Sequence, residues 1–210
     1  MNQLKREREA IKALQAERVI MLFDYQYAGH TEPPSPEWLR KWIGNELVTD
    51  VEMLSFTVIM LGGPVSENVN DDLLVHLRSL PGVKYLMLDG CQGITDQGLV
   101  HLKGMVDLEE LILSQTKITG SGFDALRKLR NLKNLDLQST PVVDSSLAKL
   151  VSHKQLEELW LTDTRITDEA VPYLTQLTEL KQLDVALTEM TPDGVQQLRK
   201  ALPNCEISDP

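Results

Sequence analysis

Apolar residues recur along the second half of the chain in five units that share the pattern LxxLxLxxTxITDxxLxxLxxLxx. The units begin at Val83, Leu108, Leu132, Leu156 and Leu180, so their starts are 25, 24, 24 and 24 residues apart. In the first part of a unit, apolar residues occupy alternate positions, as at Leu159 and Leu161, which predicts a half-buried strand. In the second part they recur every three residues, as at Val171, Leu174 and Leu177, which predicts one side of a short helix. A unit this small cannot bury its own leucines, so we expect successive units to stack in parallel around one continuous core.

The ninth position of every unit holds a small polar residue, namely Cys91, Thr116, Thr140, Thr164 and Thr188. The chain must turn sharply after the strand, and we expect this side chain to point inward and to bond backbone groups of the neighbouring turn. The Ile-Thr-Asp motif that follows predicts a helix start. Threonine is favoured over aspartate as the cap, because Pro192 directly follows Thr191 where the first helical residue is expected.

These residues resemble leucine-rich repeats. The block from Cys91 to Leu99, CQGITDQGL, is similar to the cysteine-containing subclass, and the threonine units resemble the 24-residue repeats abundant in planctomycete proteins. The segments KREREAIKAL, FDYQY, PPSPEWLRKWIG and LRKALPNCEI resemble the flanks of those bacterial proteins. The resemblance implies a surface for protein binding. Such relatives commonly place a membrane-spanning helix just before the REREAI-like segment, and this sequence has none there.

The predicted fold class is α/β: a leucine-rich-repeat solenoid with a curved parallel sheet, convex helices and an N-terminal helix–strand cap. Residues 1–50 are the predicted cap, with a helix, a strand and a short helix over 36–43 whose Trp38 and Trp42 are assigned to the core. Residues 51–82 are an irregular first repeat with a longer loop at 62–68. Residues 83–204 hold the five regular repeats, and residues 205–210 close the last one.

Composition and charge limit the classes of partner and the cellular compartment that we expect. The chain of 210 residues has a formal net charge of −10, which argues against nucleic acid. Five of its basic residues lie in residues 1–18, so the repeats carry most of the acidity. Cys91 and Cys205 lie far apart and form no CxxC pair, which fits a reducing compartment and a cytoplasmic location. The most apolar segment, VIMLF, is too short to span a bilayer.

The sequence offers no catalytic constellation, so we predict that the chain is not an enzyme and uses neither a cofactor nor a metal. His76 and His101 recur at one repeat position, which predicts solvent exposure, and His153 replaces a leucine, which predicts half-buried packing. No serine or cysteine has a base placed by a motif, and no glycine-rich phosphate loop follows a strand.

The third, fifth and seventh positions of the units are expected to form rows on the concave side of the sheet. Nine residues in these rows are the predicted partner-binding site: Tyr85, Met87, Asp89, Glu110, Ile112, Asp136, Glu158, Trp160 and Asp184. The fifteen positions include five acids and no Lys or Arg, which favours binding of a basic or amphipathic segment of another protein. The aromatic side chains of these rows are expected to anchor that segment. The alternative is that Trp160 and Ile112 simply cover each other as a cross-strand contact.

The second position alternates in sign as Lys84, Glu109, Lys133, Glu157 and Lys181, which predicts exposed ion pairs between neighbouring units. The predicted function is that of a non-catalytic, monomeric protein–protein interaction module. Two alternatives stay open: the soluble part of a membrane-anchored scaffold whose transmembrane helix is missing, and the substrate-recognition subunit of a degradation complex.

Overall fold

The structure is a computed structural model of the whole chain. It describes residues 5–6, 9–10, 12–13, 20–23, 56–60, 69–80 and 82–208. The predicted short helix over 36–43, its two tryptophans and the loop over 62–68 lie outside the described residues.

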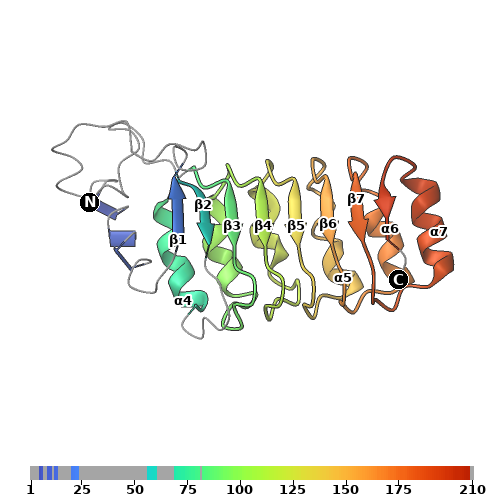
Figure 1. Cartoon of the computed structure of the whole chain (residues 1–210), viewed down its shortest axis with the longest axis horizontal. Coiled ribbons are helices and arrows are strands. Elements are labelled where there is room, and N and C mark those ends of the chain that lie inside the picture. Colours follow the sequence, from blue (N-terminus) through green and yellow to red (C-terminus); the bar gives the residue numbers. More distant parts are fainter. Residues whose placement is uncertain are drawn as a thin grey trace.

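The described strands form one sheet of eight, arranged in sequence order (Figure 1). They are β1 (Ile20–Phe23), β2 (Phe56–Met60), β3 (Tyr85–Met87), β4 (Glu110–Ile112), β5 (Asn134–Asp136), β6 (Glu158–Trp160), β7 (Gln182–Asp184) and β8 (Glu206–Ile207). β1 pairs antiparallel with β2, and every later pair is parallel. From β3 to β7 each strand is followed by a helical return, and strands laid down in this order make the molecule an elongated α/β solenoid. This confirms the predicted fold class.

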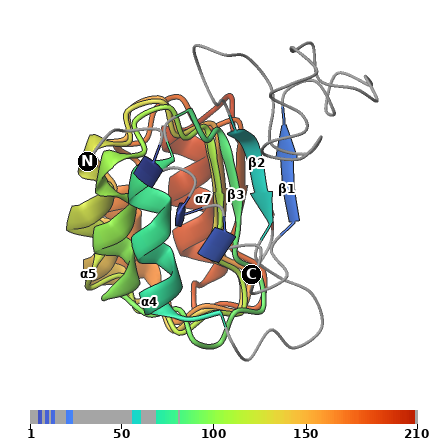
Figure 2. The same ribbon diagram turned by 90° about the vertical axis from the view of Figure 1, so that its left-hand side faces the viewer.

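The register between neighbouring strands joins equivalent positions of successive units. Leu86, Leu111, Leu135, Leu159 and Leu183 stand side by side as direct partners. All five are fully buried. The helices cover one side of the sheet (Figure 2), and side chains buried in these strands pack on that side. The sixth-position residues, from Leu88 to Val185, are also fully buried. The alternation of leucines within each strand thus supplies one uninterrupted core between the sheet and the helices.

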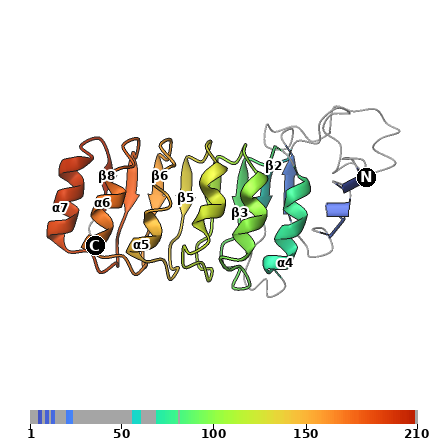
Figure 3. The same cartoon turned by 180° about the vertical axis from the view of Figure 1, so that it is seen from behind.

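The helical returns lie behind the sheet and are shorter and tighter than the predicted helices (Figure 3). They are α4 (Asp71–Leu74), η2 (Val75–Ser79), η3 (Gly98–Gly104), η4 (Phe123–Lys128), α5 (Asp144–Leu147), η5 (Asp168–Ala170), α6 (Val171–Leu174) and α7 (Pro192–Ala201). Four of these are 3₁₀ helices, which rise further per residue than an α-helix and suit a short connection between parallel strands. Only α7 is long, and it covers the C-terminal end of the stack.

The turn after each regular strand has a left-handed residue at the eighth position, with φ between 52° and 70°. These residues are Gly90, Gln115, Ser139, Asp163 and Leu187. The threonine that follows donates its hydroxyl to the carbonyl oxygen three residues back, as from Thr116 to Leu113 at 2.7 Å and from Thr188 to Val185 at 2.7 Å. The expectation of a bond to the neighbouring turn is therefore wrong: the threonine closes its own turn.

Two threonines of the Ile-Thr-Asp motif cap their helices, as predicted. Thr191 accepts from the backbone N–H of Gly194 at 3.2 Å at the start of α7, and Thr167 accepts from that of Glu169 at 3.1 Å. The motif's aspartate has a different role, because it bonds to the next unit. Asp168 accepts from the backbone N–H of Thr191 at 2.8 Å and from its hydroxyl at 2.6 Å.

Four such Asp–Thr contacts link successive units along the helical side of the solenoid. They join Asp71 to Thr95, Asp96 to Thr119, Asp144 to Thr167, and Asp168 to Thr191. Each one satisfies the N–H of a threonine at the start of a helical return and orders its hydroxyl, so the helix caps at Thr167 and Thr191 depend on the unit before them.

One junction departs from this scheme, between the second and third regular units. The expected aspartate is Gly120 and the expected threonine is Val143. Ser146 occupies the space beside Gly120, and a Cβ placed on Gly120 would collide with its side chain. At other junctions the sizes are reversed, since a Cβ on Gly98 or Gly194 would collide with the preceding unit's aspartate. At the exceptional junction the glycine belongs to the earlier unit and the larger side chain to the later unit, which is the reverse of the other junctions.

The exceptional junction has contacts of its own. Lys149 donates to the carbonyl oxygen of Ser121 at 2.6 Å and lies 3.2 Å from the Asp124 carboxylate. His153 is 4% exposed, and its Nε2 lies 3.0 Å from the carbonyl oxygen of Leu126. Its Nδ1 lies 3.2 Å from the carbonyl oxygen of Leu150. His153 is therefore buried and hydrogen-bonded across the junction, rather than half buried as predicted.

The charged second positions form the predicted ion pairs at one edge of the sheet. Glu109 lies between two lysines, 3.7 Å from Lys84 and 3.0 Å from Lys133, and Lys181 lies 2.6 Å from Glu157. Lys133 bonds to Glu109 rather than to Glu157. Exposed pairs of this kind contribute about 0.2–1 kcal/mol each, so they help to align the units but add little stability.

Candidate functional site

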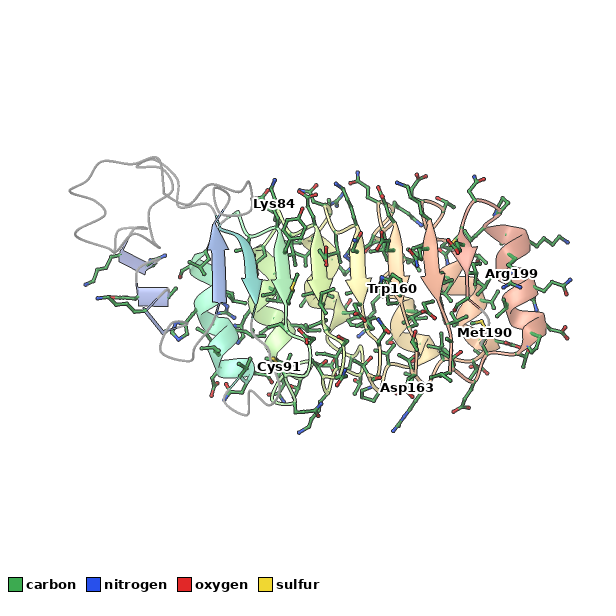
Figure 4. The ribbon with its side chains drawn as sticks, in the orientation of Figure 1. Lys84, Cys91, Trp160, Asp163, Met190 and Arg199 are labelled. Carbon is green, nitrogen blue, oxygen red and sulfur yellow. The ribbon has the colours of Figure 1, made fainter. Side chains whose placement is uncertain are left out.

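None of the described helices covers the other side of the sheet over the regular units (Figure 2). We call it the open sheet face, made of the third, fifth and seventh positions on and after β3 to β7. The third- and fifth-position side chains are half buried in every one of these strands. Figure 4 places Trp160 near the middle of this face and Asp163 at the turns along its lower edge. All nine predicted site residues belong to the open sheet face.

Acidic and apolar side chains alternate across the central strands. In the fifth-position row, Ile112 on β4 partners Asp136 on β5, which partners Trp160 on β6. In the third-position row, Asn134 stands between Glu110 and Glu158. Ile112 and Trp160 are therefore two strands apart, roughly 10 Å. The alternative of a cross-strand contact between them therefore does not take the form of a direct strand pair.

Asp136 occupies the centre of this arrangement. Its carboxylate accepts from the backbone N–H of Gln138 at 2.8 Å and from the amide Nε2 of Gln138 at 3.2 Å. Burial raises the pKa of Asp136 above its usual range, and the bonds from Gln138 and Ser114 only partly oppose that effect. The carboxylate is thus poorly solvated, and the open sheet face contains no Lys or Arg to pair with it.

A shielded hydroxyl just beyond β6 is unsatisfied among the described residues. Thr162 follows Trp160 by two residues on the same face, and its Oγ1 is shielded from solvent without a hydrogen-bond partner among the described residues. A buried polar atom left without a partner costs free energy. The described residues therefore leave this shielded hydroxyl unsatisfied beneath the open sheet face.

The remaining predicted residues lie around this centre. Tyr85 and Met87 are half buried on β3, and Asp89 is exposed just beyond that strand. The Asp184 carboxylate accepts from the Ser208 hydroxyl at 2.7 Å and from the backbone N–H of Ala186 at 2.9 Å. Asp184 is thus held by the C-terminal closing segment, and the less compensated acids are on β4 to β6.

Glu110 is destabilised in its charged form. Burial raises its pKa, and the nearby carboxylates of Glu158 and Asp136 raise it further. Its sequence neighbour Glu109 faces the edge of the sheet, where the hydrogen bond from Lys133 lowers its pKa. The pKa values of these two adjacent glutamates therefore shift in opposite directions, because Glu109 faces lysines at the edge of the sheet and Glu110 faces other carboxylates on the open sheet face.

This contrast predicts opposite pH dependence for two matched variants. The folded protein holds the Glu110 proton more tightly than the unfolded chain, so this contribution to stability is lost as the pH rises through the raised pKa. Glu110→Gln is therefore expected to have a higher melting temperature than the wild type at pH 7, and no advantage at pH 3. Glu109→Gln is expected to melt below the wild type at pH 7, with the difference disappearing at low pH. Thermal unfolding at both pH values measures this, and two variants shifting in the same direction at pH 7 would contradict it.

The described residues offer no ready chemistry for catalysis. They contain no group of three or more His, Cys, Asp or Glu side chains placed to hold a metal ion. Burial raises the pKa of the Cys91 thiol to about 12 and that of the half-buried Cys205 to about 11, so both thiols stay protonated near neutral pH. His76 and His101 are half buried rather than exposed as predicted.

The fold defines a class, that of leucine-rich-repeat proteins, and solved structures of that class are similar to this chain. Internalin C2 from Listeria monocytogenes superposes with a TM-score of 0.58 and 26% identity over 77% of this chain and 66% of its own. A leucine-rich-repeat protein from Leptospira interrogans matches with a TM-score of 0.50 and 27% identity, over 64% of this chain and 33% of its own. Another Listeria internalin matches with a TM-score of 0.50 and 22% identity, over 65% of this chain and 36% of its own.

The chain spans between a third and two thirds of the length of these three structures. No family model matches it, and neither does any curated protein. Within the part of the chain that the structure describes, none of the helices combines the length and the apolar character that crossing a membrane requires.

Proposed function

We propose that the chain is a non-catalytic module that binds another protein through the open sheet face. The observation that carries this proposal is the sheet face without a described helix over it, with half-buried Ile112 and Trp160 set among carboxylates of raised pKa. Large apolar side chains are not required on a surface that is only solvated, whereas aromatic residues are enriched at the centres of binding surfaces. The leucine-rich-repeat fold of the solved structures supports the same general role.

The partner surface is expected to be basic or amphipathic. Five acids and no basic residue occupy the fifteen face positions, and like charges on a partner would be repelled. The raised pKa of Glu110 and that of Asp136 show that the negative charges already oppose one another or lack solvation. A cationic partner would relieve this cost, so its binding is expected to be stronger at pH 7 than at pH 4.

Affinity capture from a lysate of the source cells tests the proposal. The wild type is compared with a variant of the open sheet face, Trp160→Ala with Glu158→Gln, and with a variant of the helical side, Val100→Ala with Glu169→Gln. Both variants lose one apolar group and one negative charge, and both altered apolar sites are solvent-accessible. We expect captured proteins to be lost, by at least about tenfold, only with the first variant. Recovery of the same proteins by all three baits would remove the open sheet face as the binding surface.

A further inference from the structure

The row Ile112–Asp136–Trp160 has the chemistry of a receptor for one positively charged side chain. Each member is the direct strand partner of the next, so the carboxylate stands between an aliphatic and an aromatic side chain. Glu158 lies on β6 two residues before Trp160, and Glu110 lies on β4 two residues before Ile112. All five side chains share one face of three adjacent strands.

The hydrogen bonds of Asp136 leave room for a further donor. A carboxylate has about four acceptor positions, and the backbone and side-chain N–H groups of Gln138 occupy two of them. The nearest lysine in the repeat pattern, Lys133, is bonded to Glu109 at the edge of the sheet. None of the fifteen described positions of the open sheet face therefore supplies a cation to this desolvated carboxylate.

We propose that Ile112, Asp136 and Trp160 form a subsite for a single arginine side chain presented by a partner protein. This inference rests on the proposed function and names the chemistry of its central contact. The guanidinium donates one hydrogen bond to Asp136 and stacks on the indole of Trp160, while the aliphatic stem packs against Ile112. Its other N–H groups point toward Glu110 and Glu158.

Arginine fits this row better than lysine for two physical reasons. Its planar guanidinium stacks on an aromatic face and is more weakly hydrated than an ammonium group, so it loses less on entering a half-buried site. It also offers five donors in a fixed plane, which suits three carboxylates on neighbouring strands.

A peptide titration of the full chain tests the subsite. Three blocked five-residue peptides of glycine and serine carry one central arginine, lysine or citrulline, the last being neutral and nearly the same shape as arginine. Binding is followed by the indole N–H resonance of Trp160, which is assigned by its absence in Trp160→Phe. We expect the arginine peptide to bind most tightly, lysine more weakly, and citrulline at least about tenfold more weakly than arginine, because a charge-assisted hydrogen bond is lost.

Two variants with the same change of charge complete the test. Asp136→Asn is expected to weaken the arginine peptide by about tenfold, whereas Asp163→Asn, at an exposed turn outside the row, leaves it unchanged. Citrulline binding as well as arginine, lysine binding more tightly, or an unaffected Asp136→Asn would each overturn the subsite. If the arginine peptide fails to bind while the Trp160→Ala, Glu158→Gln bait still loses its captured proteins, the subsite is wrong and the proposed function stands.

Discussion

Replacing Phe123 by alanine is expected to lower the free energy of unfolding by about 3–5 kcal/mol. Phe123 is the largest of the fully buried side chains, and it lies at the start of η4, where neighbouring units have leucine. Close packing leaves the surrounding residues little freedom to fill the space. The loss therefore includes the transfer of the ring to water and the cavity that remains. Urea unfolding followed by circular dichroism measures it.

The variant Phe123→Leu serves as the matched control. Leucine occupies the equivalent position in the units on either side, as Leu99 and Leu147, so it retains most of the apolar volume and is expected to cost clearly less than alanine. In a solenoid each unit is stabilised by its neighbours, and loss of packing in one unit is expected to reduce the stability of both adjoining ones. An alanine variant within about 1 kcal/mol of the wild type, below the range for such truncations, would show that the ring does not fill the core as described.

Introducing the consensus aspartate at the exceptional junction is expected to destabilise the protein. Gly120→Asp should cost roughly 2–4 kcal/mol, because Gly120 has a φ of +86° and a Cβ there collides with Ser146. The same Cβ would lie 2.9 Å from the ring of Phe123. Sequence logic alone predicts the reverse, since aspartate stands at this place in three other units. Urea unfolding of the single variant decides between these expectations.

A rescue experiment tests whether the exchanged sizes are the cause. Adding Ser146→Gly and Val143→Thr to Gly120→Asp rebuilds the arrangement of the other junctions, with space for the carboxylate and a threonine to donate to it. We expect the triple variant to recover more than half of the lost stability. Ser146→Gly with Val143→Thr on the wild-type background lacks the aspartate and is the control, and it should gain nothing. If the triple variant does not recover stability, the contact with Ser146 is not the cause of the stability lost in Gly120→Asp.

The open sheet face could be assigned to particular residues in advance because strand periodicity and repeat length together fix which side chains share a row. Ile112, Asp136 and Trp160 were placed on the same side of the sheet from their common position in three units. Their role in binding stays a proposal. What the pattern did not provide is the effect of this neighbourhood on Asp136 and Glu110, because a pKa depends on burial and on the distances to other charges.

On the helical side, the Asp–Thr contacts were likewise only partly predictable from the sequence. The Ile-Thr-Asp motif predicted a cap, and threonine is that cap, but the aspartate bonds to a residue 23 positions later in the chain, as Asp168 does to Thr191. A local reading of helix starts considers only the first turn. The simultaneous absence of aspartate at Gly120 and threonine at Val143 was the available signal that the two residues belong to one contact.

By itself the amino-acid sequence determined the repeat, the stacking of parallel strands, the buried leucines and the acidic character of the open sheet face. These follow from periodicity, because any regular stack of such units must place equivalent residues side by side. The tertiary structure alone decided how one unit meets the next: which aspartate bonds which threonine, where serine takes the place of a carboxylate, and which carboxylate lies desolvated between Ile112 and Trp160. Those features depend on the shapes and separations of side chains from different units, which a one-dimensional pattern does not contain.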